Sequence, residues 1–260
     1  GRNHGIHSDV QRRVHAEELK LATAADRIIA CSHFMAKQVC DVFGVPAAKV
    51  DVIANGVDVS RLIDTEFDHA TFRAQYAQPD ERIVLYVGRL VGEKGIFVLL
   101  EAVPRALAGY PKIKFIAVGS GPALEEARTR AGGHDWSRRV QFTGFVADEV
   151  RNRLYQVADA AVFPSIYEPF GLVALEAMAL GVPVVSSNAG GLAEVVDADT
   201  AVVVEAGSAV SLADGIVEAL AHPEESRARA ERAEVRATTQ FTWGSIADET
   251  LLLYQRLVGT

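Results

Sequence analysis

The chain has 260 residues, of which 49% are hydrophobic and 23% are charged, the balance of a globular protein with a sizeable core. A formal net charge of −8 disfavours a nucleic-acid partner, because phosphate contacts need a basic face. The longest apolar run, residues 158–164 with Asp159 inside it, is too short for a transmembrane segment. Two cysteines, Cys31 and Cys40, favour a cytoplasmic protein over a disulfide-bonded secreted scaffold.

Apolar, β-rich runs alternate with helical periods along the chain, which is typical of a parallel sheet with helices on both faces. The predicted strands, in chain order, are 27–31, 50–54, 83–87, 114–118, 140–143, 160–164, 183–187 and 201–204. The predicted helices are 9–25, 33–43, 71–76, 96–108, 122–131, 148–158, 171–180, 192–196, 208–221, 224–238 and 242–257. We therefore expect an α/β, Rossmann-like, doubly wound parallel sheet.

A turn at residues 55–58 and a polar, irregular stretch after it indicate a domain boundary. Residues 1–60 supply too few strands for a full sheet, whereas residues 61–240 contain enough for a complete doubly wound unit. Residues 241–260 form a strongly apolar last helix that needs another surface to cover. We expect this helix to cross back and pack on the N-terminal part.

The run from Glu168 to Glu176 is the most informative stretch of the sequence. Phe170, Gly171 and Leu172 form a helix entry, where free backbone N–H groups suit an anion such as a diphosphate. Glu168 lies before this entry and Glu176 lies inside the helix, and ionised carboxylates accept hydrogen bonds from hydroxyl groups. A diphosphate with hydroxyl groups on either side indicates a nucleotide-activated sugar.

A second candidate segment is the Gly-rich loop after the strand at 83–87. Gly88 lets the backbone approach a ligand closely, and Arg89 and Lys94 bring two positive charges to a place suited to a diphosphate. The alternative is that Arg89 and Lys94 pair with Glu93 and other surface acids.

Two further strand ends point to the same edge of the sheet. Residues 118–122 resemble the start of a dinucleotide fingerprint but lack its third glycine, so we expect a tight turn in which Gly121 also skirts the ligand. Backbone groups near Phe145 and Val146 are placed to read a nucleobase edge, and the alternative is a loop packed into the core. Asn188, Gly190 and Gly191 form another strand-to-helix turn beside the Glu168 segment.

Taken together, these segments resemble glycosyltransferase family 4, the large retaining group with the GT-B fold that includes glycogen and sucrose-type synthases. The resemblance covers nearly the whole chain and is carried by residues 55–58, 88–95, 168–176 and 181–185. It implies that Glu168 bonds the hydroxyls of the donor sugar and that Glu176 bonds the ribose. It also implies the remaining donor contacts: the diphosphate held by Arg89 and Lys94, the base contacted near Phe145 and Val146, and the donor faced by amides at Phe170, Gly171 and Leu172. Neither a metal nor another cofactor is implied.

The chain departs from the family pattern in lacking most of the first domain, including the catalytic His usually found there. We interpret residues 1–60 as the end of an acceptor domain, with the missing part supplied by a longer polypeptide or a partner chain. Residues 1–7 resemble the segment after that His in α-glucan-synthase-like relatives, which favours ADP- or UDP-glucose and an α-glucan acceptor. Alone, the chain is expected to bind donor weakly and to turn over slowly or not at all.

Other functions stay open at this point. His4, His7 and His15 lack a carboxylate or Cys at ligand spacing, which favours an acceptor-facing loop over a metal site. A GT-B relative with phosphorylase or epimerase chemistry, and a nucleotide-sugar-binding module without catalysis, are the main alternatives. A nicotinamide-dependent enzyme is the weakest, because no full G-x-G-x-x-G motif is present.

Overall fold

The computed structural model describes residues 8–64 and 66–259. The helices are α1 (Asp9–Ala24), α2 (His33–Phe43), α3 (His69–Ala74), α4 (Ile96–Gly109), α5 (Leu124–Gly132), α6 (Asp148–Val157), α7 (Leu172–Ala179), α8 (Leu192–Val195), α9 (Ala209–Ala221), α10 (Pro223–Gln240) and α11 (Trp243–Val258). The strands are β1 (Ile28–Ala30), β2 (Val50–Val52), β3 (Arg82–Val87), β4 (Ile113–Val118), β5 (Val140–Gly144), β6 (Ala160–Phe163), β7 (Val184–Ser187) and β8 (Val202–Val204). Every one of the described helices is too short or too polar to cross a lipid bilayer.

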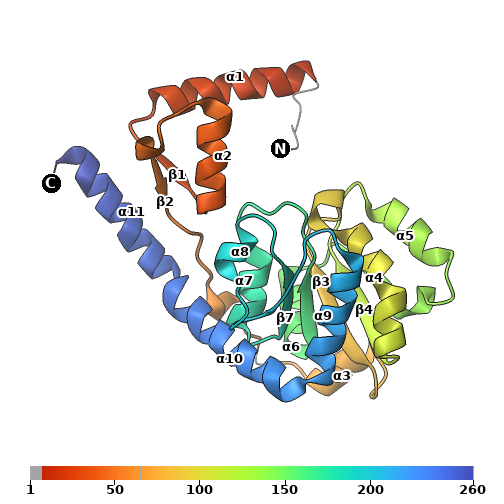
Figure 1. Ribbon diagram of the computed structural model, residues 1–260. Coiled ribbons are helices and arrows are strands. Elements are labelled where there is room, and N and C mark those ends of the chain that lie inside the picture. The colour runs from red at the N-terminus through yellow and green to blue at the C-terminus, as the bar shows by residue number, and fades with distance from the viewer. Residues whose placement is uncertain (1–7, 65, 260) are drawn as a thin grey trace.

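A six-stranded parallel sheet forms the centre of the molecule, as predicted, and its strand order is β5-β4-β3-β6-β7-β8. Two buried clusters sandwich it. One joins α3, α6, α7 and α10 to one face, and the other joins α4, α5 and α9 to the opposite face. The chain thus folds as a Rossmann-like α/β layer structure (Figure 1).

The central strand β3 shows why the strands of this sheet are continuous apolar runs in the sequence. Ile83, Leu85 and Val87 point into one cluster, while Val84 and Tyr86 point into the other. Successive side chains of a strand face opposite sides, so a strand covered on both faces needs apolar residues at every position. The local sequence and the layered packing therefore agree.

The N-terminal part is a smaller α/β piece. Strands β1 and β2 pair in parallel as a two-stranded sheet, and α2 begins at the N-cap Ser32 and ends at Gly44 with φ 66°. Along α1, which is fully described, every residue keeps at least partial solvent exposure. In Figure 1 this piece lies apart from the large sheet.

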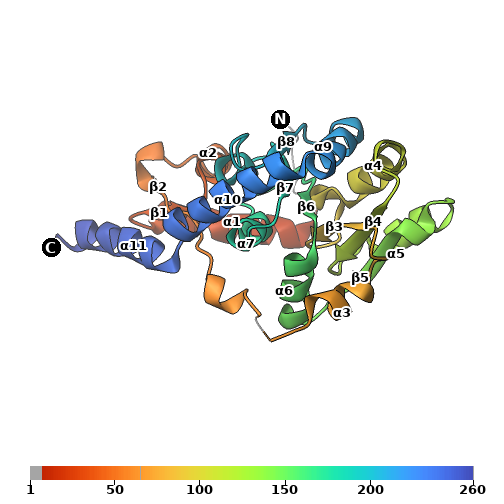
Figure 2. The same cartoon turned by 90° about the horizontal axis from the view of Figure 1, so that it is seen from below.

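The last helix connects the two parts. Helix α10 runs along the large sheet, and α11 continues past β1 and β2 (Figures 1 and 2). Ile246 and Leu253 of α11 pack on Ile53, just beyond β2. Val57 also forms a short parallel bridge with Thr242. The division of the chain into domains at residues 60 and 240 stays a prediction.

Candidate functional site

The strand order reverses between β3 and β6, and ligands of open α/β sheets bind beyond the carboxyl ends of the strands at such a point. A pocket of about 310 Å³ lies there. Its wall includes Arg89 and Lys94 after β3 and Glu168 to Val173 after β6. Cys31 and Asn55 of the N-terminal part complete it. The structure thus brings together two of the segments singled out in the sequence.

The loop after β3 is locked to the loop after β6. A short 3₁₀ turn, Gly92–Lys94, leads into Gly95, which has φ 75° and whose added Cβ would overlap the Pro164 carbonyl. The Glu93 carbonyl accepts hydrogen bonds from the backbone N–H groups of Ile166 at 2.8 Å and Tyr167 at 3.2 Å. This close backbone approach places Lys94 opposite Glu168.

Lys94 and Glu168 form a partly buried ion pair. Lys94 Nζ lies 2.6 Å from Glu168 Oε2, and the side chains are 24% and 8% exposed. Ser165 Oγ donates to the same carboxylate oxygen at 3.2 Å. Lys94 therefore pairs with this acid of the other loop and not with its neighbour Glu93. The ammonium keeps further N–H donors for a ligand.

Arg89 is the second predicted cation of this site, and its side chain is exposed. Within residues 8–64 and 66–259, no acid lies within ion-pair distance of its guanidinium. The buried Tyr86 hydroxyl donates to the Arg89 carbonyl at 3.0 Å, which fixes the backbone of the loop. Arg89 lines the first pocket and also a neighbouring one, so its charge is available to both.

The start of α7 follows the predicted helix entry. Gly171 has φ 116°, and an added Cβ would lie 2.6 Å from Leu192 Cδ1, so only glycine fits here. Phe170 is buried and Leu172 is 46% exposed. Phe170, Gly171 and Leu172 all line the first pocket.

A second pocket of about 300 Å³ shares Gly88 and Arg89 with the first. Phe145, which is 79% exposed, and Val146 form part of its wall. Asp148 and Arg151 at the start of α6 also line it. The predicted base-contacting segment and the predicted diphosphate loop are therefore the two sides of one cavity.

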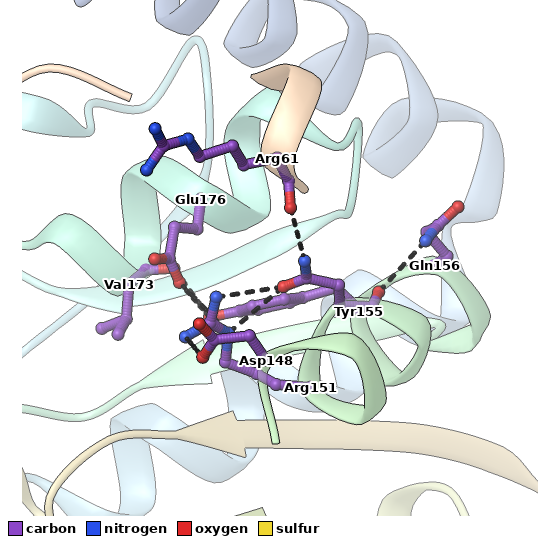
Figure 3. Close-up of polar contacts among 8 residues, drawn as sticks. Arg61, Asp148, Arg151, Tyr155, Gln156, Val173 and Glu176 are labelled. Atoms are coloured by element: carbon purple, nitrogen blue, oxygen red, sulfur yellow. Dashed lines mark hydrogen bonds and ion pairs between the residues drawn. The ribbon is translucent and has the colours of Figure 1, made fainter. Parts of the chain in front are cut away.

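Glu176, on α7, points toward Tyr155 and Arg151 of α6 (Figure 3). Tyr155 Oη lies 3.4 Å from Glu176 Oε2, and Arg151 Nε lies 4.0 Å from the same atom. Burial raises the pKa of the Glu176 carboxyl, while the charge of Arg151 and the hydroxyl of Tyr155 oppose that rise. Glu168 thus lines the first pocket, whereas Glu176 lies beside Arg151, which lines the second.

The predicted turn at residues 118–122 is divided between two roles. Gly119 and Ser120 line the second pocket. Gly121, with φ 157°, lies outside both pockets as the described residues define them, because its Cα packs against the Leu90 carbonyl. The absence of a side chain at Gly121 therefore serves the approach of two backbone segments.

The turn with Asn188, Gly190 and Gly191 packs against the backbone of Glu168. The Gly191 N–H donates to the Glu168 carbonyl at 2.8 Å. The Gly190 Cα lies so close to the Phe34 ring that an added Cβ would come within 2.9 Å of it. Asn188 turns away, and its side chain accepts from the Ala206 N–H at 3.0 Å.

Contacts from the N-terminal part reach the same loop. Ser32 Oγ donates to the Pro169 carbonyl at 2.7 Å, while the backbone N–H groups of His33 and Phe34 donate to Glu194, each at 2.8 Å. These bonds hold the start of α2 against the Glu168 segment and place Cys31 at the pocket.

Sequence reasoning missed several lining residues. Cys31, Asn55, Ser165, Asp148 and Arg151 all line one of the two pockets. The spacing of Asp148 and Arg151 in the first turn of a helix that follows Phe145 was an available signal, since residues three apart share a helix face.

The histidine cluster considered for metal binding is only partly described. His4 and His7 lie outside the described residues, and His15 stacks on Phe43 with ring centroids 5.4 Å apart. Among the residues with described positions, no group of three or more His, Cys, Asp or Glu side chains is arranged to hold a metal ion. A donor site that works without metal stays a prediction.

Comparison with known proteins agrees with this geometry. A profile described as "Glycosyl transferases group 1" matches residues 68–236, and a profile described as "Glycosyltransferase Family 4" matches residues 1–61. The chain therefore belongs to the glycosyl transferases group 1 family, as the resemblance of its motifs predicted.

Individual relatives also support membership of this family. A protein named glycogen synthase from Mycobacterium tuberculosis is 36% identical over 256 residues, covering 98% of this chain and 60% of the relative. An uncharacterised glycosyltransferase of Methanocaldococcus jannaschii is 34% identical, covering 98% of this chain and 66% of the relative. The chain thus spans about 60% of the length of the first of these relatives.

Solved structures share the fold. The Anabaena protein HepE, in complex with UDP and glucose, superposes with a TM-score of 0.85 at 26% identity, covering 97% of this chain and 70% of HepE. Sucrose-phosphate synthase from Thermosynechococcus elongatus gives a TM-score of 0.79 at 32% identity, covering 97% of this chain and 63% of that protein. These neighbours establish a GT-B type fold.

Proposed function

We propose that this chain is the donor-binding half of a retaining glycosyltransferase, which moves a hexose from a nucleoside-diphosphate sugar to an acceptor. The observation that supports this most directly is the Lys94–Glu168 pair, 2.6 Å long, at the strand-switch pocket. It places a cation for the diphosphate and a carboxylate for sugar hydroxyls within one cavity. The UDP and glucose bound by HepE support the same donor class.

The two pockets suggest how a donor is divided between them. The hexose would occupy the first pocket against Glu168, and the nucleoside the second, beside Phe145 and Val146. The diphosphate would then cross the wall that both pockets share, at Gly88 and Arg89. Glu176, which faces the second pocket's Arg151, would accept hydrogen bonds from the ribose.

This placement defines the work of each charge during transfer. When the bond between the sugar's anomeric carbon and the β-phosphate oxygen breaks, its electron pair stays on that oxygen. Arg89 and Lys94 would stabilise the negative charge, as fixed cations do most effectively where charge develops in the transition state. An acceptor hydroxyl would form the new bond to the anomeric carbon on the same face and pass its proton to the departing diphosphate oxygen. Glu168 would hold the sugar's other hydroxyls, so no protein nucleophile is required.

The acceptor and the rest of the enzyme are further parts of the proposal. The relatives named glycogen synthase favour an α-glucan acceptor. The first domain of these relatives, which this chain covers only in part, would close the other side of the cleft, whether in one polypeptide or as a partner chain. Cys31 and Asn55 already bring the N-terminal part to the edge of the pocket.

Calorimetry with the 260-residue chain tests the donor class. We expect UDP, ADP or their glucose esters to bind in the micromolar to millimolar range, and Arg89→Ala to weaken binding of the diphosphates by about tenfold. Equal affinity for a nucleoside and its diphosphate would contradict a diphosphate site at Arg89. Coupled nucleotide release should show little or no turnover by this chain alone, and robust turnover would refute the proposal that half the cleft is missing.

A further inference from the structure

Glu176 is a carboxylate whose acceptor sites are left open. Its closest donors are Tyr155 Oη at 3.4 Å and Arg151 Nε at 4.0 Å, both longer than an ordinary hydrogen bond to a charged group. The single Tyr155 hydrogen has a better acceptor in the Val173 carbonyl, at 3.1 Å. Among the described residues, therefore, none occupies the lone pairs of Glu176 at short range.

Arg151 is held beside Glu176 by other partners (Figure 3). Its guanidinium donates to Asp148 Oδ1 at 2.9 Å and, at 3.0 and 3.3 Å, to Asn152 Oδ1. Asn152 is 5% exposed, and its Nδ2 donates to the Arg61 carbonyl at 2.8 Å. These bonds fix the guanidinium, so it compensates the charge of Glu176 without taking up its oxygens.

We propose that Arg151, anchored by Asn152 and Asp148, is a positioning residue that keeps Glu176 ionised and open for the two ribose hydroxyls of the donor. The proposal rests on the donor site described above. A bidentate arginine would take up about two of the roughly four acceptor sites of a carboxylate, whereas a cation about 4 Å away supplies Coulomb attraction and leaves these sites to the ligand. The position of Arg151 on the wall of the second pocket puts this arrangement next to the nucleoside.

The charged groups around Glu176 are consistent with this role. Helix α6 supplies Arg151, Tyr155 and Asp148, and these three groups act on the Glu176 carboxyl in addition to its burial. The 3₁₀ turn Val59–Arg61 supplies Arg61, whose side chain lies 3.1 Å from Asp58. Helix α10 brings Glu234 to Gly181, beyond the far end of α7. Arg151 is thus the nearest described cation to Glu176.

The test compares the wild-type chain with Arg151→Met and Arg151→Lys by calorimetry at pH 6 and pH 8. The probes are UDP and ADP, each with its 2′,3′-dideoxy analogue. In the wild type we expect loss of the ribose hydroxyls to weaken binding by about tenfold at both pH values. In Arg151→Met this ratio should fall below about threefold at pH 6 and recover at pH 8, because the carboxyl becomes easier to protonate. Arg151→Lys should restore most of the ratio.

Arg153→Met is the matched control. Arg153 lies on the same helix with similar exposure, 26%, but pairs with Asp64 and Glu149 away from the pocket, so the ribose ratio should keep its wild-type value. Urea unfolding of each variant checks that it is folded. An Arg151→Met chain that keeps the tenfold ratio at pH 6, or loses affinity equally for both analogues, overturns the positioning role alone. A wild type that binds no nucleotide overturns the donor site as well.

Discussion

The two glutamates that begin and end the 168–176 segment occupy opposite kinds of environment. Glu168 is 8% exposed and receives a 2.6 Å bond from Lys94 and a 3.2 Å bond from Ser165, whereas Glu176 is 22% exposed and its nearest donors stand at 3.4 and 4.0 Å. A ligand reaching Glu168 must share or displace partners already present. A ligand reaching Glu176 meets open acceptors.

The two environments predict different roles for the two acids, one in stability and the other in ligand binding. Breaking a buried pair leaves one charge uncompensated, which typically costs about 3–5 kcal/mol. Removal of either partner is therefore expected to destabilise the folded state before any donor binds. Glu176 is partly buried without close donors, and this burial disfavours its charged form and raises its pKa. The fold tolerates this cost at the position where a ribose would supply the missing hydrogen bonds.

Lys94→Ala is expected to give the largest effect. In the full-length enzyme it should lower kcat by about two to three decades, because the diphosphate loses a cation as its charge develops. Coupled nucleotide release measures this. Lys112→Ala is a suitable control, since Lys112 pairs with Asp80 at 2.6 Å on the surface, where both side chains are at least 60% exposed. A loss under threefold for Lys94→Ala would remove this residue from the mechanism.

Gly95→Ala should disturb the Lys94–Glu168 pair by displacing the backbone of the loop that carries Lys94. Gly95 has φ 75°, and a Cβ there would overlap the Pro164 carbonyl, so the loop carrying Lys94 must shift. We expect the free energy of unfolding to fall by about 3 kcal/mol in urea denaturation. Gly92→Ala, in the same loop, meets no heavy atom within 4 Å and should change stability little. Similar losses for both variants would contradict the close approach.

Glutamine at the two acids should change stability in opposite directions. Glu168→Gln removes the charge that holds Lys94 and should destabilise the chain by about 2 kcal/mol. Glu176 has a folded pKa raised by burial, so the folded state binds its proton more tightly than the unfolded state does. Its contribution to stability is therefore full at acid pH and declines as pH rises through the folded pKa. Glu176→Gln should then unfold with a higher free energy than the wild type at pH 8 and lose this advantage near pH 4.

Urea unfolding of Glu168→Gln and Glu176→Gln, measured between pH 4 and pH 8, tests both expectations. Destabilisation by Glu176→Gln at pH 8 would show that its carboxylate is satisfied in the free protein, and the contrast with Glu168 would disappear.

Much of the fold was predictable from local pattern. Each expected strand and helix is present, with ends that differ by no more than two residues, because buried parallel strands and amphipathic helices leave clear periods. The order of strands in the sheet is set by packing between distant segments, and local pattern does not carry it.

The sequence predicted which segments form the site better than it predicted how they are arranged in space. The Gly-rich loop and the helix entry were found from their residue types, but the Lys94–Glu168 pair joins residues 74 positions apart. The two glutamates were expected to grasp one donor from either side of a helix start. Gly171, with φ 116°, turns the chain between them, so each acid meets a different neighbouring element. Arg151 escaped notice because its role depends on how α6 lies against α7.

Tyr155→Phe should give the smallest change. It tests whether the Tyr155 hydroxyl bonds mainly to the Val173 carbonyl or to Glu176. The Tyr155 hydroxyl is buried, and burial raises its pKa well above the ordinary value, so it stays a donor throughout the working pH range. Its loss leaves the Val173 carbonyl without that bond and should lower the free energy of unfolding by about 1 kcal/mol. Because the bond to Glu176 is the longer one, nucleotide affinity should change less than threefold. A tenfold loss of affinity with unchanged stability would instead mean that the hydroxyl serves Glu176 first, and that Glu176 is less open than its distances indicate.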